Sequence, residues 1–203
     1  MFLLLVFASV HFTCGYAAGS SPVRYKPTSV RDFKSYLEGK EGLKQYQDGW
    51  KFLTTGKEMY LYQRSFQEDP KYGNKCKCVK SKHLTVKEEA QTVAADLSFL
   101  HENLTSVHFT VYFSVNKTGK ESRVIYASYE PEKPGFPFPV AFADYESCAV
   151  VRVPHRDKGK NQACELWVYK DHVKRVKSCC FFIFDLLCGP NKYKVYDEEK
   201  CKE

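Results

Sequence analysis

Hydrophobic and polar residues alternate through most of the chain between Lys57 and Tyr169, which is the pattern of strands buried on one face. In the clearest stretch, SVHFTVYFSVN, every second residue from Val107 to Val115 is apolar. The alternation predicts eight strands, at residues 57–67, 75–83, 89–100, 106–115, 121–129, 138–144, 147–153 and 163–169. Eight short antiparallel strands joined by tight turns predict an all-β sandwich or barrel, and an eight-stranded barrel is just wide enough to hold one small ligand.

The hydrophobic period becomes helical on both sides of this strand region. Residues 29–53 carry apolar positions near helical spacing, interrupted by Gly39 and Gly42, so this segment is helical or irregular. After the last strand, DHVKRVKSCCFFIFDLLCG predicts one helix that ends at Gly189. We expect its apolar half, residues 181–187, to pack on the outside of the barrel. The tail NKYKVYDEEKC is expected to add a short strand and a cysteine that ties it back.

The N-terminus carries the apolar run MFLLLVFASV followed by small residues, which predicts a secretory signal peptide at residues 1–18. The run is too short to span a bilayer, and no later segment has the length and apolarity of a membrane helix. Residues 19–203 show no repeat or linker and are predicted to form a single domain. We therefore expect a secreted, extracellular protein with no membrane association.

Cysteines and sequons agree with secretion. Removal of Cys14 leaves eight cysteines, and an even number in a secreted chain predicts disulfides, although the count alone assigns no pair. A metal site is not expected, because the cysteine spacings lack the gaps of zinc ligands and no histidine pair has ligand spacing. The sequons at Asn103 and Asn116 predict surface glycosylation.

Charge and chemistry narrow the function classes. The formal net charge is +7, but acidic residues are scattered among the basic ones, which favours solubility over a nucleic-acid partner. No nucleophile, zinc-protease, phosphate-loop or dinucleotide motif is present, so we expect neither an enzyme nor a cofactor. The aromatic content of 15% suits a large core, a ligand cavity or both.

The stretch EMYLYQRSF holds a candidate binding residue. Strict alternation places Arg64 on the same face as Tyr60, Tyr62 and Phe66. If Phe66 faces the barrel interior, Arg64 does too, and a cation in an aromatic-lined cavity would suit a carboxylate ligand. The alternative is that this face points outward, or that Arg64 pairs with a local acid.

Four blocks between Asp48 and Cys201 resemble, in order and spacing, the salivary lipocalins of ticks known as the histamine-binding-protein group. They are DGWKFL; MYLYQRSFQEDPKYGNKCKCV; CAVVRVP with the later ELW and CC; and FDLLCGPNKYKVYDEEKC. The resemblance implies an eight-stranded antiparallel lipocalin barrel with an N-terminal helical segment and a C-terminal helix packed outside. It also implies the disulfide Cys78–Cys201 and a second one from Cys148 to Cys179 or Cys180, and it leaves Cys76, Cys164, Cys188 and the other member of the Cys179/Cys180 pair unassigned.

The function that this resemblance implies is sequestration of small host mediators, a biogenic amine such as histamine or serotonin, or a leukotriene or fatty-acid type lipid, by a monomer that counters host defence. The alternative is a salivary inhibitor that binds a host protein, for example a complement component, through its outer surface. An open pocket with charged groups favours the first function, and a barrel closed by bulky side chains favours the second.

Carried over position by position, the family's amine-binding pattern is partly kept. The matching positions are Phe66, Asp69, Tyr72, Tyr126, Glu165 and Trp167. Two acids are lost, because Ala149 follows the first cysteine of the pattern and Pro139 aligns near another pocket acid. A buried ammonium needs a carboxylate and aromatic faces, so one amine site is expected at most. The alternatives are a salt bridge from a lysine to Glu165, a turn role for Asp69 and core packing for Trp167.

Overall fold

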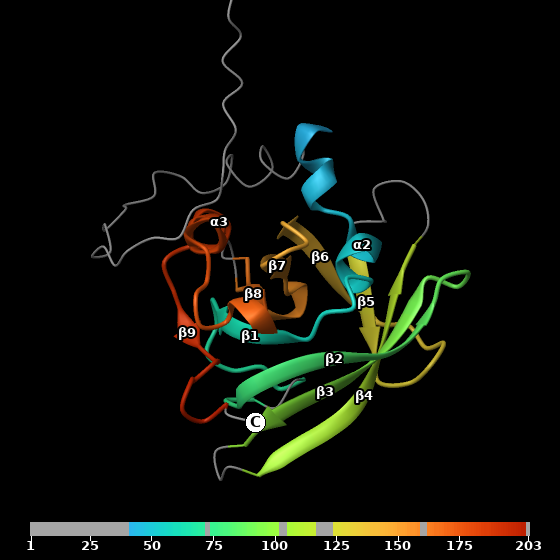
Figure 1. The fold of residues 1–203 in the computed structure, drawn as a ribbon, viewed down its shortest axis with the longest axis horizontal. Coiled ribbons are helices and arrows are strands. Elements are labelled where there is room, and N and C mark those ends of the chain that lie inside the picture. Colours follow the sequence, from blue (N-terminus) through green and yellow to red (C-terminus); the bar gives the residue numbers. More distant parts are fainter. Residues whose placement is uncertain (1–40, 72–73, 102–104, 117–123, 159–161, 202–203) are drawn as a thin grey trace, which may run out of the picture.

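The computed structural model describes residues 41–71, 74–101, 105–116, 124–158 and 162–201, and these form a closed antiparallel barrel (Figure 1). The strands of the barrel are β1 (Met59–Arg64), β2 (Lys77–Lys87), β3 (Thr92–Leu100), β4 (Ser106–Val115), β5 (Val124–Ser128), β6 (Phe136–Ala143), β7 (Cys148–Arg152) and β8 (Cys164–Tyr169). Each pairs with the next in the chain, β8 pairs with β1, and β1 pairs with β2 to close the ring. The predicted all-β, eight-stranded barrel is confirmed, with strand ends shifted by a few residues.

Helices cover the outside and one end of the barrel. The 3-10 helix η1 (Glu41–Tyr46) and the short α2 (Gly49–Leu53) precede β1, and the Asp48 carboxylate caps α2 by accepting the Lys51 N–H at 2.9 Å. Residues 29–40 of the predicted N-terminal helical segment lie outside the described residues, as does the predicted signal peptide. Two further 3-10 turns, η3 (Pro154–Arg156) and η4 (Lys170–His172), follow β7 and β8. Within the described residues no helix is long and apolar enough to cross a membrane.

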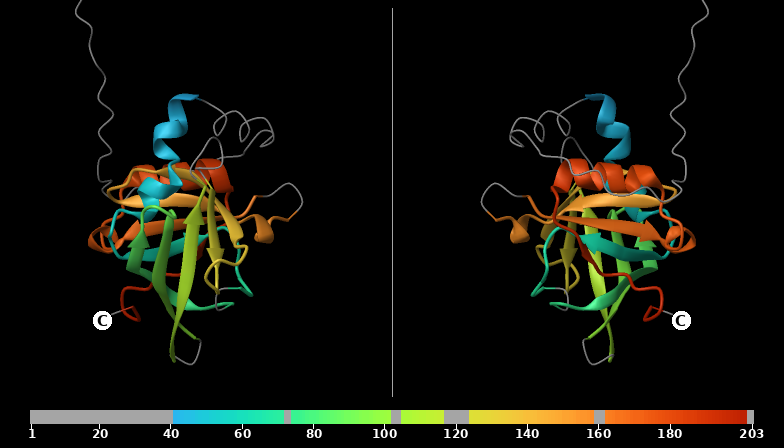
Figure 2. Two further views of the ribbon diagram at one scale, coloured as in Figure 1. Left: turned by 90° about the vertical axis from the view of Figure 1, so that its right-hand side faces the viewer. Right: turned by 90° about the vertical axis from the view of Figure 1, so that its left-hand side faces the viewer.

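The C-terminal helix α3 (Ser178–Cys188) packs against the outer faces of β7 and β8, as predicted (Figure 2). It begins seven residues later than the sequence pattern suggests. The chain leaves β8 through η4 and is extended at Lys177, with φ −64° and ψ 140°, so helical geometry starts only at Ser178. The short strand β9 (Tyr193–Lys194) then pairs with β1, which confirms the strand expected in the tail.

Apolar side chains form two layers. One fills the barrel interior and includes Leu61, Val79 and Phe138; the other lies between the barrel and α3 and includes Leu166 and Phe184. Strict alternation would place Arg64 with Tyr60 and Tyr62, and this part of the prediction is wrong. An irregularity between Leu61 and Gln63 shifts the register of β1, so Tyr60 and Tyr62 face the outer layer while Arg64 and Phe66 face inward.

Among the described residues, three disulfides tie α3 and the tail to the barrel. They are Cys78–Cys201, Cys148–Cys180 and Cys164–Cys188, with sequence separations of 123, 32 and 24 residues. The first two are the pairings that the family resemblance implied, and Cys180 is the partner of Cys148, whereas Cys179 lies half-buried next to it on α3. The third pair was not assigned from the sequence. Cys76 is buried as a thiol.

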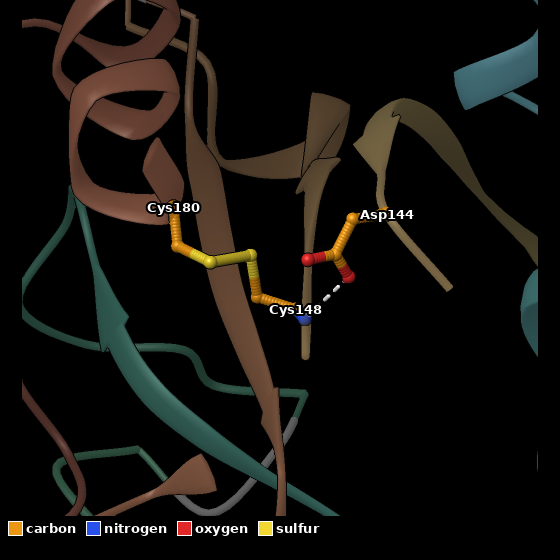
Figure 3. A group of neighbouring side chains, drawn as sticks. All are labelled: Asp144, Cys148 and Cys180. Atoms are coloured by element: carbon orange, nitrogen blue, oxygen red, sulfur yellow. Dashed lines mark hydrogen bonds between the residues drawn. A yellow bond between two sulfur atoms is a disulfide. The ribbon is translucent and has the colours of Figure 1, made fainter. Parts of the chain in front are cut away.

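Asp144 lies beside the Cys148–Cys180 disulfide (Figure 3). The three side chains lie as close together as metal ligands would, but they already have other bonding partners. The two sulfurs are bonded to each other, and the Asp144 carboxylate accepts the N–H groups of Glu146, Ser147 and Cys148 at 3.0, 2.7 and 2.9 Å. Burial alone would raise the pKa of Asp144, but these hydrogen bonds and that from the Ser147 hydroxyl lower it. The group therefore fixes the turn between β6 and β7.

Candidate ligand cavity

The barrel interior contains a cavity whose empty volume is about 660 Å³ when its opening to solvent is included. Its walls come from α2 and from all eight barrel strands, and the lining residues are Phe52, Leu53, Met59, Leu61, Val79, Ser81, His83, Leu97, Phe113, Ile125, Phe138, Val151, Glu165 and Trp167. Only Ser81, His83 and Glu165 carry polar side chains apart from the indole N–H of Trp167.

Glu165 is the acidic group of this wall. It points inward from β8, and only 4% of its surface is exposed. Its Oε2 accepts a hydrogen bond from Trp167 Nε1 at 3.0 Å. Burial raises the pKa of Glu165 from 4.5 to about 7 and Asp69 adds to the rise, while the Trp167 hydrogen bond and Arg64 act in the opposite direction. Among the described residues no lysine forms an ion pair with Glu165, so the salt-bridge alternative is not realised there.

His83 lies at the other end of the cavity, on the face of β2 that also presents Val79 and Ser81. Within the part of the chain that the structure describes, neither ring nitrogen of His83 has a hydrogen-bond partner, although both are shielded from solvent. Burial lowers the pKa of His83, because an imidazolium loses its hydration there. The imidazole is therefore neutral near pH 7 and has one donor and one acceptor to offer.

Asp69 does not line the cavity, although it was predicted with Glu165 as a ligand acid. It is fully buried, and His155 Nε2 lies 3.1 Å and 3.3 Å from its two carboxylate oxygens. The carboxylate also accepts the N–H of Lys71 at 3.0 Å, and Asp69 forms an isolated bridge with Asn74. Asp69 therefore has the turn role that the Asp-Pro sequence suggested, and its carboxylate is already in contact with the His155 imidazole.

Arg64 is 2% exposed and faces the same buried region, beyond the cavity wall. Its Nη2 donates to the carbonyls of Gln67 and Asn74 at 2.7 and 2.6 Å, and the guanidinium lies 5.4 Å from the centroid of the Phe66 ring. Phe66 is buried in the barrel core. Arg64 thus does not point outward and forms no ion pair with a described acid; it holds the chain that connects β1 to β2.

The structure thus brings two of the predicted binding residues, Glu165 and Trp167, into the cavity wall and groups Arg64, Phe66 and Asp69 next to it. Tyr126 lies on the face of β5 opposite to the buried Ile125 and Ala127 and is half-buried. Tyr72 and Asn103 lie outside the described residues, whereas Asn116 is described and exposed. Sequence reasoning did not identify His83 or Ser81, although their alternation with Val79 is the signal that could have found them.

Ala149 lies directly across from Trp167 in the β7–β8 pairing and is completely buried in the barrel interior. An aspartate at this position would place a second carboxylate beside the Trp167 ring. Its replacement by alanine leaves Glu165 as the one acid among the described lining residues.

Comparison with known proteins identifies the family. A family model described as tick histamine binding protein matches residues 37–203. The male-specific histamine-binding salivary protein of Rhipicephalus appendiculatus is 27% identical over 184 residues, which cover 79% of this chain and 84% of that protein.

Two solved structures share the barrel. Japanin from Rhipicephalus appendiculatus, solved bound to cholesterol, aligns with a TM-score of 0.54 and 17% identity over 71% of this chain and 95% of its own. Lobster apocrustacyanin A1 aligns with a TM-score of 0.50 and 12% identity over 75% of this chain and 87% of its own. At these identities the likeness shows the lipocalin fold alone.

The family match covers all eight strands, α3 and the tail, and therefore the whole cavity wall. Members of this family are ligand-binding proteins and not enzymes. The chain belongs to the tick histamine-binding protein family.

Proposed function

We propose that the protein binds and sequesters a small aromatic amine in its barrel cavity, with the ammonium group at Glu165. The observation that carries this proposal is the position of Glu165, a buried carboxyl in an apolar wall whose pKa is raised to about 7. A carboxyl with a raised pKa lacks compensation for its charge. A ligand that brings a positive charge would supply this compensation.

The remaining wall suits the body of such a ligand. An ammonium leaves water at a large cost unless a carboxylate and aromatic faces replace its hydration. Phe113, Phe138 and Trp167 line the same cavity as Glu165. The name of the salivary relative, which includes histamine binding, agrees with this ligand class.

An acidic lipid fits the cavity less well. No Lys or Arg is among the described lining residues, and the Arg64 guanidinium donates to backbone carbonyls outside the wall. A ligand carboxylate would instead meet Glu165. An uncharged lipid is the second candidate, because most of the lining side chains are apolar and Japanin is a structural neighbour solved with cholesterol.

The biological role that we propose is removal of a host mediator from solution outside the cell. The predicted signal peptide and the salivary origin of the named relative support secretion. The presence of a cavity with a charged group supports a small-molecule ligand over a function that uses only the outer surface.

Calorimetric titration of the secreted protein with histamine, serotonin, tryptamine, a leukotriene and cholesterol tests this proposal. We expect at least one amine to bind with a Kd below about 10 micromolar, which is about −7 kcal/mol. Glu165→Gln should weaken that amine at least about tenfold and leave cholesterol unaffected, while the matched exposed control Glu130→Gln should change neither. Absence of amine binding, or equal loss of amine and cholesterol in Glu165→Gln, would overturn the proposal.

A further inference from the structure

We propose that His83 determines ligand specificity at the end of the cavity remote from Glu165, by hydrogen bonding to a polar group at the far end of the bound amine. The ligand class is then an amine with an elongated apolar body and a hydroxyl or N–H group distant from its ammonium. This inference rests on the proposed function, because it takes Glu165 as the site of the ammonium.

The hydrogen-bonding state of His83 is the first argument. Its Nδ1 and Nε2 are both shielded from solvent, and neither has a partner among the described residues. Buried polar atoms in folded proteins are almost always paired, and each exception needs an explanation. A ligand group that reaches the imidazole would provide the missing hydrogen bond.

The position of His83 is the second argument. In the β1–β2 pairing Met59 lies opposite Ser81, so His83 lies two residues further along β2, near the start of β1 and the preceding helix α2. Glu165 pairs with Arg64 at the other end of β1. The two side chains line one cavity and are separated by about six residues of strand, roughly 20 Å at 3.3 Å per residue before their side chains reach inward.

This separation indicates a ligand longer than histamine. A compact amine held at Glu165 would leave the His83 nitrogens unpaired, whereas an extended one would satisfy both ends. Apolar residues, among them Leu61, Val79 and Leu97, lie between the two polar ends. The wall therefore favours hydrocarbon or aromatic groups in the middle of the ligand.

The charge state of His83 is compatible with an ammonium bound at Glu165. Because burial lowers the pKa of His83, the imidazole is uncharged near pH 7 and does not repel a bound ammonium. The neutral ring can donate from one nitrogen and accept at the other. A hydroxyl, which both donates and accepts, can bind either nitrogen.

The test uses pairs of ligands that differ only in the distal group. Linear amino alcohols with four to twelve carbons are titrated against alkylamines of the same length, and serotonin is titrated against tryptamine. We expect the hydroxyl to improve affinity about tenfold in at least one pair, as an added hydrogen bond to a buried unpaired group would. The length with the largest gain reports the distance between the two ends of the site.

Variants assign the gain to His83. His83→Phe should abolish the hydroxyl advantage while keeping alkylamine affinity, and His83→Gln, which retains a donor and an acceptor, should restore part of it. His172→Phe is the matched control, because this half-buried histidine on η4 is not among the lining residues. If His83→Phe does not fold, His83→Leu provides the same comparison.

The outcomes separate this inference from the proposed function. If alkylamines bind in a Glu165-dependent manner but the hydroxyl gives no advantage at any length, or the advantage persists in His83→Phe, the role of His83 is refuted and the amine site stands. If alkylamines bind equally well to the wild type and to Glu165→Gln, the proposed function itself fails. A hydroxyl advantage lost in His83→Phe and kept in His172→Phe supports the inference.

Discussion

Replacement of Glu165 by glutamine should have two effects of opposite sign: it should stabilise the unliganded protein at neutral pH and weaken amine binding. Both effects have the same origin, because the carboxyl is buried in an apolar wall without an ion-pair partner among the described residues. Glutamine has nearly the same shape and keeps an oxygen that can accept the Trp167 N–H. The substitution therefore removes the charge with little change in packing.

The magnitude follows from the pKa of Glu165, which burial raises from 4.5 to about 7. Each tenfold change in the ionisation constant corresponds to 1.36 kcal/mol, so ionised Glu165 reduces the free energy of unfolding by about 3 kcal/mol. For an acid with a raised folded-state pKa, the stabilising contribution is fully present below pH 4.5 and is lost as the pH rises through 7. We expect Glu165→Gln to match the wild type near pH 4 and to exceed it by about 2–3 kcal/mol at pH 7.5.

Urea unfolding of the oxidised protein, followed by tryptophan fluorescence at pH 4 and pH 7.5, measures this difference, and calorimetry measures the loss of amine affinity. Loss of a buried ammonium–carboxylate contact should cost about 2–5 kcal/mol of binding free energy. The exposed control Glu130→Gln should show no pH-dependent change in stability. Our reasoning is refuted if the stability difference between wild type and Glu165→Gln is the same at both pH values, or if the variant is less stable at pH 7.5.

Three further predictions concern the same elements. Amine affinity should fall about tenfold per pH unit below pH 6, because the ligand must displace the proton that Glu165 holds below its pKa of about 7. Calorimetric titrations at pH 5.0, 6.0 and 7.5 in buffers of different ionisation enthalpy should show this proton release. The double variant Cys164→Ala/Cys188→Ala opens a loop of 24 residues and should lower the free energy of unfolding by about 3 kcal/mol in urea, while amine affinity stays the same because this disulfide lies outside the cavity wall. Asp69→Asn should change amine affinity by less than about threefold, under 1 kcal/mol, because the Asp69 carboxylate already contacts the His155 imidazole. A tenfold loss of affinity by calorimetry would show that Asp69 takes part in amine binding.

The barrel could be predicted from the sequence because one-sided burial leaves a period of two in each strand, as in the stretch from Val107 to Val115. The α3 helix was placed correctly on the outside, but its start was not, because residues 171–177 have helical periodicity and yet form η4 and an extended residue. The pair Cys164–Cys188 could not be assigned, since a disulfide depends on the distance between strand and helix and not on spacing in the chain.

In the candidate site, the sequence identified Glu165 and Trp167 through a family motif but could not separate the cavity wall from the buried residues next to it. Arg64 and Asp69 are as deeply buried as Glu165, and only the structure shows that their polar atoms are used by the chain between β1 and β2 and by His155. His83 was not identified as a binding residue, because its alternation with Val79 and Ser81 indicates only that it shares their face of β2. Its two unpaired nitrogens are visible only in three dimensions.

The irregularity in β1 links these observations to ligand choice. Because the register shifts after Leu61, Arg64 pairs across the sheet with Glu165, yet its Nη2 donates to the carbonyls of Gln67 and Asn74 and not to the Glu165 carboxylate. Arg64 is accordingly the smallest of the four influences on the pKa of Glu165, and burial prevails. A cation that could have neutralised the cavity acid thus donates to the β1–β2 connection, and in the function that we propose the ligand supplies the positive charge beside Glu165.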